Sequence, residues 1–463
     1  MECGGNDAAL AGHALSPVPG TAPSLARAEE CDLPEGWRIA RLDEVVQSSR
    51  RSRGGPTDAD SKTPFIPMAL LPNDGLPTTS WEMRSVEEVR SGVPFAEGDV
   101  LLAKITPCLE NGKLGIASGI PGGWGMTSTE VYPLRAERVT TEFLACFLSL
   151  PSVRHGLASK MQGATGRQRL PKEALDAFPI PVPPLPEQRA IAEALRTVQR
   201  AKEACERVLA ATRQLKQSLL HHLFTYGPVP FADAAQVPLK ETEMGPRPEH
   251  WGTIRLGDTA SIGNGSTPKR TEPRYWDGGA IPWLTSAKVH DGTIRHADEF
   301  VTKTAREECH LPMVSRGSLV IAITGQGKTL GNAAKLDLEA CVSQHLAYVT
   351  FHDTRLLPEF VLAFLRLRYD ELQAISRGGG STKGALTCGF LKSFEVPLPP
   401  LPEQRDIAAQ LAAVDAKLAA EESRRAALAA LFQSLLHHLM TGQVRVPLDC
   451  GGKRSATPLS PST

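Results

Sequence analysis

The chain has 463 residues, of which 41% are hydrophobic, and its Lys plus Arg and its Asp plus Glu both total 51, so the formal net charge is zero. This length is typical of three or four structural units. The balanced charge excludes a polycationic tail as a means of binding nucleic acid, but it leaves room for a basic patch on one surface. Runs of eighteen or more apolar residues are absent from the sequence, so no membrane-spanning helix is expected.

The first thirty residues are rich in Ala, Gly, Pro and Ser. They lack the basic start and the apolar centre of a signal peptide, so residues 1–30 are expected to be a disordered leader. Nine cysteines are scattered along the chain without a C-x-x-C pair. That spacing favours structural thiols in a reducing, cytoplasmic compartment over disulfide bonds or a zinc site.

A first globular segment, residues 31–182, mixes short strand patterns, turns and a few helices, and it shares spaced positions with a second segment at 248–396. Both open on Pro-Glu-x-Trp, both carry a strand-like apolar run after a turn, and both contain a short amphipathic helix. The matching pairs are Pro34–Trp37 with Pro248–Trp251, Val100–Leu102 with Leu319–Ile321, and Glu142–Leu148 with Glu359–Leu365. We therefore expect an α+β fold with two similar domains related by a pseudo-two-fold axis, whose differing contents suit two different half-sites.

A glycine-rich loop near the end of the first segment aligns with another glycine-rich loop 216 residues later. Their sequences are GATGRQRL at 163–170 and GGSTKGAL at 379–386. Free backbone N–H groups, hydroxyls and cations together form a cradle for phosphate. The predicted DNA-binding residues of these loops are Thr165, Arg167, Gln168, Arg169, Ser381, Thr382 and Lys383. A solvated loop without a ligand is the alternative, and the repetition favours DNA binding.

The most informative feature is a stretch of 41 residues, 183–223, that recurs at 399–439 with 23 identities and no gap, where average residue usage gives about three by chance. Each copy opens with PPLPEQR and ends with SLLHHL before a glycine. Glu187 and Glu403 place negative charge at the positive end of each predicted helix. At 1.5 Å per residue such a helix is ~55 Å long, more than one small domain can cover.

Apolar residues recur in alternating steps of four and three along both copies, which is typical of a coiled-coil seam. The stripe of the second copy is Ile407, Leu411, Val414, Leu418, Glu421, Arg425, Leu428, Phe432, Leu435 and Leu439. Its polar breaks fall in the middle, where they would fix the register. We expect long helices at 183–225 and 397–441 to form an antiparallel coiled coil, with a linker at 226–247 and a disordered tail at 442–463. Packing of each helix on its own domain is the alternative.

The segment Ala322–Thr329, AITGQGKT, fits a permissive phosphate-loop pattern after a strand. A phosphate loop must open a helix, but Gly331 and Asn332 follow and indicate a turn or hairpin. The first repeat carries a similar Gly-Lys element at Gly112–Gly115 without any phosphate-loop pattern. We therefore interpret Lys113 and Lys328 as cations at hairpin tips that lie near DNA.

Other chemical signatures are missing from the sequence. No motif for amino methylation of bases, no glycine-rich S-adenosylmethionine loop and no persuasive nucleophile–histidine order is present. The paired histidines His221-His222 and His437-His438 lack the spacing and the accompanying ligands of a metal site. They are interpreted as packing or partner-docking elements, and no catalytic residue and no metal site is predicted.

The duplicated PLPPLPEQR followed by a long helix ending in SLLHHL, with the entry PEGW and the linker ETEMG before PEHW, resembles the conserved regions of type I restriction–modification specificity subunits. The resemblance covers about residues 31–441. It implies two target recognition domains that each read half of a split, asymmetric DNA sequence, and a helix pair that acts as a ruler between them.

The same resemblance implies a non-catalytic subunit whose partners are double-stranded DNA, two methyltransferase subunits and restriction (motor-nuclease) subunits. S-adenosylmethionine, ATP and Mg are expected on those partners and no cofactor on this chain. The competing interpretations are a stand-alone nuclease or ATPase, which the missing motifs disfavour, and a coiled-coil adaptor without DNA contact, which the duplicated basic loops disfavour.

Overall fold

The computed structural model describes residues 33–48, 62–78, 80–164, 166–325, 327–378 and 386–447. The expected leader, and the expected tail beyond residue 447, lie outside these ranges. The chain divides into two compact units: unit 1 is Met1–Glu203 with Ala426–Thr463, and unit 2 is Ala204–Arg425. Each unit therefore combines one globular segment with part of both long helices.

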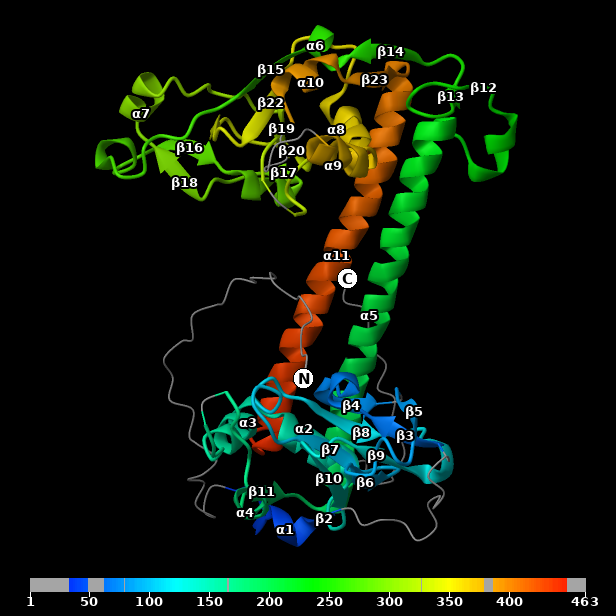
Figure 1. The fold of residues 1–463 in the computed structure, drawn as a ribbon, viewed down its shortest axis with the longest axis vertical. Helices are drawn as coiled ribbons and strands as arrows, with labels where there is room; N and C mark the ends of the chain where they lie inside the picture. The colour runs from blue at the N-terminus through cyan, green and yellow to red at the C-terminus, as the bar shows by residue number, and fades with distance from the viewer. Residues whose placement is uncertain are drawn as a thin grey trace, which may run out of the picture. The chain divides into compact units, whose positions relative to one another are not determined.

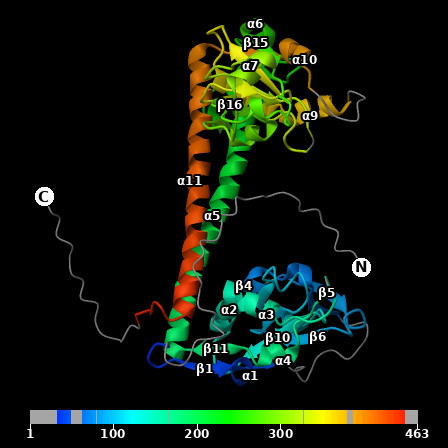
Figure 2. The same cartoon turned by 90° about the vertical axis from the view of Figure 1, so that its left-hand side faces the viewer.

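The globular part of unit 1 is built from short strands, short α-helices and single turns of 3-10 helix (Figures 1 and 2). In chain order its elements are β1 (Arg38–Arg41), α1 (Leu42–Val45), β2 (Val46–Ser48), β3 (Lys62–Ile66), η3 (Met68–Leu70), β4 (Asn73–Thr78), β5 (Glu82–Ser85), β6 (Val93–Ala96), β7 (Val100–Ala103), β8 (Leu114–Ala117), η4 (Pro121–Gly123), β9 (Trp124–Thr127), β10 (Val131–Ala136), α2 (Thr141–Ser149), α3 (Pro151–Ala158), α4 (Lys172–Asp176) and β11 (Pro179–Val182).

Unit 2 repeats this mixture after a short lead-in. Its elements are η5 (Phe231–Gln236), β12 (Leu239–Lys240), β13 (Arg247–Pro248), β14 (Gly252–Arg255), α6 (Leu256–Thr259), β15 (Ala260–Asn264), η6 (Pro273–Tyr275), β16 (Ile281–Leu284), η7 (Ser286–Asp291), β17 (Thr293–Ile294), β18 (Glu299–Val301), α7 (Lys303–Glu308), β19 (Leu319–Ala322), β20 (Ala333–Leu336), β21 (Cys341–Val342), β22 (Leu346–Phe351), α8 (Pro358–Leu367), α9 (Tyr369–Gly378), α10 (Cys388–Ser393) and β23 (Glu395–Leu398).

The main sheet of each unit has five strands in the same spatial order. The order is β2-β10-β7-β8-β4 in unit 1 and β15-β22-β19-β20-β17 in unit 2. In both sheets the last strand is parallel to its neighbour and the other pairs are antiparallel. A two-stranded sheet also pairs the first and last strands of each globular part, β1 with β11 and β14 with β23. The expected α+β fold and its internal repeat are confirmed.

The units diverge in a second sheet. It has four strands in unit 1, β5-β3-β9-β6, and three in unit 2, β18-β16-β21. The parallel pair β3–β9 corresponds to β16–β21, so the extra strand of unit 1 is β6. The predicted pattern, a shared frame with different contents, therefore extends to whole strands.

The expected amphipathic helices are α2 and α8, which pack on the main sheets. Phe143 and Phe360, at matching positions of these helices, are fully buried in the core of their units. Burying such a side chain stabilises a fold by roughly 1.5–3 kcal/mol. Thr140 caps the N-terminus of helix α2, and its hydroxyl accepts a hydrogen bond from the Phe143 backbone N–H at 3.3 Å.

The connection between β19 and β20 shows that the phosphate-loop pattern at Ala322–Thr329 does not open a helix. Strand β20 returns antiparallel to β19, and the Ala322 N–H donates to the Asn332 backbone oxygen at 2.9 Å, so a hairpin and not a helix follows β19.

The hairpin register also corrects one prediction. Ala103 donates to Lys113 just as Ala322 donates to Asn332, so Lys113 corresponds to Asn332. The sequence pattern pairs Lys113 with Lys328 because both follow a glycine, and this pairing is wrong. The residue equivalent to Lys113 lies four positions after Lys328.

The two long helices are α5 (Leu185–Tyr226) and α11 (Leu401–Met440). The glycine that follows each SLLHHL sequence lies just beyond the end of its helix: Gly227 and Gly442 have φ values of +83° and +71°, as is common for glycines that end helices. Within unit 1, Ile191 and Leu195 of α5 share a core with Leu436 and Leu439 of α11.

Within unit 2, Leu219 and Leu223 pack in the same core as Ile407 and Leu411 of α11. Early residues of α5 therefore pack with late residues of α11, and late residues of α5 pack with early residues of α11. The two helices run antiparallel, side by side (Figure 1). The antiparallel coiled coil is confirmed.

The polar break in the stripe is a specific contact. The Cys205 thiol lies 3.2 Å from the Glu421 backbone oxygen and 3.4 Å from its Oε2. Both residues are buried, and they hold the same position of the 216-residue repeat. In an antiparallel pair of equivalent helices a residue meets its own counterpart only at the centre of the pair, so this contact marks the register. Arg425, which we had placed in the stripe, is exposed.

Candidate nucleic-acid interface

In unit 1 the predicted glycine-rich loop lies beside the β7–β8 hairpin loop. The Thr106 N–H donates to the Gln168 oxygen at 3.0 Å, and the Leu170 N–H donates to the Lys104 oxygen at 2.8 Å. The Tyr132 hydroxyl adds a bond to the Leu170 oxygen at 2.9 Å. These bonds bring residues 104–113 and 163–170 together at one edge of the main sheet, which we call the loop edge of unit 1.

The predicted DNA-binding residues of this loop have different surroundings. Arg167 is exposed, whereas Gln168 is half-buried and is held through its backbone. Arg169 forms a bidentate pair with Glu130, from Nε to Oε2 at 2.9 Å and from Nη2 to Oε1 at 2.8 Å. The Arg169 guanidinium holds the pKa of Glu130 below its ordinary value. Thr165 lies outside the described residues.

The second glycine-rich loop is tied down at the matching place. The Leu386 N–H donates to the Ile323 oxygen at 2.8 Å, as Leu170 does to Lys104. Ser381, Thr382 and Lys383, the predicted contacts of this loop, lie outside the described residues. Their role in DNA binding stays a prediction.

The two hairpin lysines have different environments. The Lys113 ammonium donates to the backbone oxygens of Leu71 at 2.9 Å and Ala69 at 3.3 Å, so it fastens β8 to the segment before β4. Lys328 is exposed. Its backbone oxygen accepts the Tyr369 hydroxyl at 2.7 Å, which ties the second hairpin loop to α9. Of the two side chains, Lys328 is therefore the better placed for a ligand.

Polar side chains gather at the same edge of unit 2. His290 Nε2 lies 3.0 Å from the Thr329 hydroxyl, and Asn332 Nδ2 lies 3.4 Å from His290 Nδ1. Thr324 is hydrogen-bonded to His345, which comes directly before β22. The sequence reading missed these histidines because they belong to different loops that only the sheet brings together.

The Glu-Gln pair of the repeated motif has a role that the sequence reading also missed. Glu187 and Glu403 lie in the first turns of α5 and α11, as the helix-dipole interpretation requires. In addition, the Trp37 indole N–H donates to Glu187 Oε2 at 3.1 Å, and the Trp251 indole N–H donates to Glu403 Oε2 at 2.8 Å. Glu187 is 1% exposed and also takes a bidentate pair from Arg445. The Pro-Glu-x-Trp entry and the PPLPEQR motif are therefore two halves of one anchor.

The glutamines complete the anchor. Gln188 accepts from the Thr140 N–H at 2.8 Å and donates to the Pro183 oxygen at 2.9 Å. Gln404 does the same with the Leu357 N–H and the Pro399 oxygen, both at 2.9 Å. In each unit this side chain joins the proline lead-in, the long helix and the start of the sheet-covering helix. The Glu-Gln pair of the repeated motif thus forms the hydrogen bonds that hold the globular part of each unit on its long helix.

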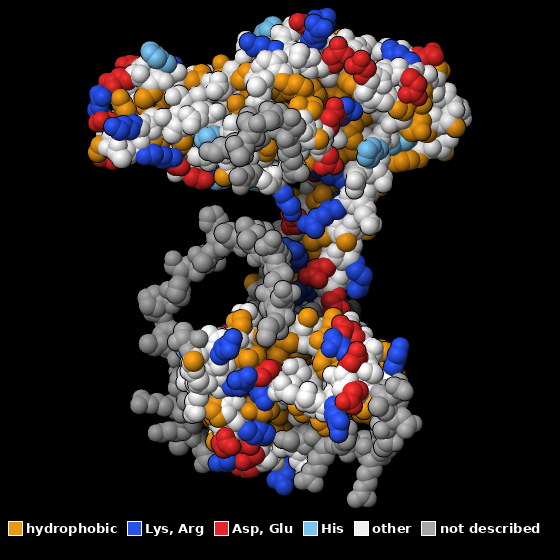
Figure 3. Space-filling model, in the orientation of Figure 1, with side chains coloured by type: hydrophobic (Ala, Val, Ile, Leu, Met, Phe, Trp, Pro, Cys, Tyr) orange, Lys and Arg blue, Asp and Glu red, His pale blue; other side chains and the backbone are white. Residues whose placement is uncertain are grey.

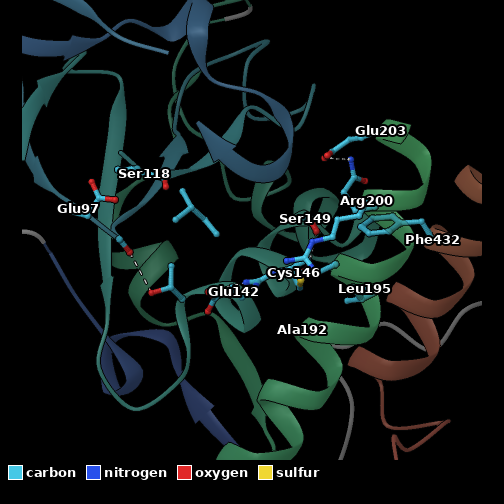
Figure 4. A pocket seen from close by; sticks show the side chains of 16 residues that line it. Glu97, Ser118, Glu142, Cys146, Ser149, Ala192, Leu195, Arg200, Glu203 and Phe432 are labelled. Carbon is cyan, nitrogen blue, oxygen red and sulfur yellow. Dashed lines mark hydrogen bonds and ion pairs between the residues drawn. The ribbon is translucent and has the colours of Figure 1, made fainter. Parts of the chain in front are cut away.

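A groove lies between α2 and the long helices in unit 1, with a cavity of about 560 Å³ (Figure 4). A second cavity of about 660 Å³ occupies the matching place in unit 2. Pairs of lining residues at equivalent positions are Glu142 with Glu359, Cys146 with Ala363, Ala192 with Ala408, Leu195 with Leu411, Gln199 with Asp415, and Phe432 with Lys216. Each carboxylate is paired, Glu142 with Arg196 at 3.0 Å and Glu359 with Lys335 at 2.6 Å.

On the face shown in Figure 3, acidic and basic side chains are interspersed in both units. Within the described ranges no three His, Cys, Asp or Glu side chains are grouped so that they could hold a metal ion, and no described helix has the length and apolarity needed to cross a membrane. His222 packs on Phe231 with ring centroids 3.9 Å apart, in keeping with the packing role expected for the paired histidines.

Several proteins are similar to this chain in sequence. The specificity subunit of the EcoAI type I restriction enzyme of Escherichia coli is 32% identical over 163 residues, which are 35% of this chain and 27% of that protein. The chain thus spans about a quarter of that relative. The putative MjaX specificity subunit of Methanocaldococcus jannaschii is 22% identical over 424 residues, 90% of this chain and 95% of the relative.

Solved structures show the same fold. One, titled as the structural basis underlying complex assembly and conformational transition of the type I R-M system, has a TM-score of 0.58 at 22% identity and covers 89% of this chain and 99% of its own. The S subunit of the type I restriction–modification system of M. genitalium has a TM-score of 0.53 at 15% identity, with 87% and 96% covered.

The model of the type I restriction modification DNA specificity domain matches the chain twice, at residues 34–210 and 248–430. These two ranges contain both main sheets, both anchors and the first part of each long helix, up to residue 210 of α5 and residue 430 of α11. The chain therefore belongs to the type I restriction–modification specificity subunit family and carries the family's domain in duplicate.

Proposed function

We propose that this chain is the DNA-recognition subunit of a type I restriction–modification complex, and that units 1 and 2 each read one half of a split, asymmetric target. The observation that carries the proposal is the repeated main sheet with different side chains at the same edge. Glu130 and Arg169 occupy that edge in unit 1, and Thr324 and His345 occupy it in unit 2. Equal frames with unequal loops fit two half-sites of different sequence.

The long helices join the recognition units. Each helix contributes residues to both units, so the register fixed by Cys205 and Glu421 would set the separation of the half-sites. Half-sites one helical turn apart on a duplex are about 34 Å apart and present the same groove. A change in helix length is then expected to change the spacer between the half-sites and not their sequence.

This chain supplies recognition, and partner subunits supply the chemistry. The methyltransferase subunits would hold S-adenosylmethionine and flip the target base from the stack. The restriction subunits would use ATP and Mg²⁺. The residues of this chain at the interface, among them Arg167, Gln168 and Lys328, act by donating hydrogen bonds to phosphates and base edges.

Two copies of the methyltransferase subunit are proposed to dock on the long helices. Leu215 on α5 and Leu431 on α11 hold the same repeat position, and they are 52% and 45% exposed. Exposed leucines that are duplicated with the repeat fit one partner bound twice. We expect L215E to remove one methyltransferase copy, L431E to remove the other, and the double variant to remove both, as measured by native mass spectrometry. Retention of two copies by the double variant would exclude this surface.

The central test is the set of bases modified in DNA when this chain is produced with its methyltransferase subunit. We expect one split sequence to be methylated. Exchange of residues 31–182 for those of another family member should change one half of that sequence and leave the other half and the spacer unchanged. Methylation without a split target, or a change in both halves after the exchange, would refute two independent recognition units.

A further inference from the structure

The Arg169–Glu130 pair in unit 1 leaves one end of the guanidinium free. Glu130 takes Nε and one hydrogen of Nη2, at 2.9 and 2.8 Å. Within the described residues no hydrogen-bond partner is present at Nη1. The unused donors, at Nη1 and the outer side of Nη2, form a planar fork that points away from the carboxylate.

The fork is held in place at both ends of the side chain. At the backbone, the Arg169 N–H donates to the Gln162 oxygen at 2.8 Å and the Gln162 N–H returns a bond to Arg169 at 2.9 Å. The neighbouring Gln168 oxygen accepts from Thr106 at 3.0 Å. At the tip, Glu130 holds the guanidinium, although 54% of the Arg169 side chain is exposed. A long exposed side chain fixed at both ends is suited to a task that depends on orientation.

We propose that Arg169, oriented by Glu130, reads a guanine in the first half-site. This inference rests on the proposed function and changes the role of Arg169 from a phosphate contact to a base contact. A guanine presents O6 and N7 to the major groove as two adjacent acceptors, and the free fork of an arginine matches them in a bidentate contact. Glu130 then acts as a positioning residue that keeps the fork aimed at the base edge.

Charge distinguishes a base contact from a phosphate contact. An arginine that binds phosphate gains from an undiminished positive charge, because its contribution comes from neutralising the backbone. Glu130 cancels that charge at close range and would itself repel a phosphate. The same cancellation weakens a base contact less than a phosphate contact, because an arginine that reads a base contributes through two directed hydrogen bonds. The carboxylate is therefore a cost for a phosphate contact and an advantage for base readout.

Unit 2 lacks this pair. Val131 and Leu346 start equivalent strands, since they face Ala103 and Ala322 in the same register, so His345 holds the position of Glu130. In the sequence repeat, Ala385 holds the position of Arg169. At these two positions the fork is therefore found in unit 1 and not in unit 2, so a guanine read from them is expected in one half of the target only.

The test is selection of binding sites from a pool of duplexes with randomised half-sites, using the full chain with its methyltransferase subunit. We expect R169A to lower the preference for guanine at one position of the first half-site by roughly 5- to 150-fold. R169K keeps the charge and removes the fork, so it should lose the same preference. E130Q should reduce the preference partly while overall DNA affinity rises, because a negative charge is removed.

R167A is the matched control from the same loop. It should lower affinity for all sequences and reduce the salt dependence without changing any base preference. Guanine preference that survives in R169A, or that R169K restores, would overturn the inference and return Arg169 to a phosphate contact. If the unaltered chain selects no split sequence at all, the proposed function fails and the inference falls with it.

Discussion

Removing the carboxylate of Glu187 should destabilise unit 1, because this carboxylate accepts the buried hydrogen bond of its anchor. In the E187A variant the buried Trp37 indole N–H loses its acceptor at 3.1 Å, and an unsatisfied buried donor costs about 1–3 kcal/mol. The half-exposed Arg445 also loses its partner, but solvent screens that pair, so it adds little to the loss. The expected loss in the free energy of unfolding is therefore about 1–3 kcal/mol.

Urea unfolding combined with hydrogen–deuterium exchange provides the assay, because it assigns the loss to a region. Amides of β1, β11 and the start of α5 should lose protection in E187A, while those of β14 and β23 keep theirs. E187Q is the conservative variant. Its amide oxygen still accepts from Trp37 and only the solvent-screened charge pair with Arg445 is gone, so it should lose much less stability than E187A. A loss below about 0.5 kcal/mol in E187A would refute the role assigned to this hydrogen bond.

Three further predictions concern other parts of the molecule. F143A and F360A should each cost about 3–5 kcal/mol, and exchange should show the loss confined to unit 1 and unit 2 respectively; a loss shared by both units would contradict independent cores. Burial raises the pKa of the Cys146 thiol to about 12, so iodoacetamide at pH 8 should leave Cys146 unmodified in native protein and label it in urea, as checked by mass spectrometry. The pKa of Glu130 is lowered in the folded protein. The pair with Arg169 is therefore present above the ordinary glutamate pKa and is lost only as the pH falls through the lower folded pKa. The preference for guanine should be equal at pH 6 and pH 8, and a difference between these two values would contradict the pairing.

Much of the frame was predictable because it is repeated in the sequence. The 4-3 stripe identified both long helices, and the ungapped match of 183–223 with 399–439 implied that they pair with one another. The histidines of the unit 2 loop edge were not predictable, since a β-sheet gathers residues that are distant in sequence. The hairpin alignment failed for a related reason. Loop residues carry little register information, and only the strand hydrogen bonds showed that Lys113 corresponds to Asn332.

The anchor explains how recognition can change without loss of the fold. Trp37, Glu187 and Gln188 hold the frame of unit 1 on α5 through buried side-chain hydrogen bonds, and none of these bonds involves the loop edge. Arg169 and Glu130, in contrast, bond to one another at the surface. Arg169 is exposed and Glu130 is partly buried, and substitutions at exposed sites such as Arg169 usually change stability by less than about 0.5 kcal/mol. The loops are therefore free to vary while the frame stays fixed, as expected if the sequence that each unit reads diverged after the duplication.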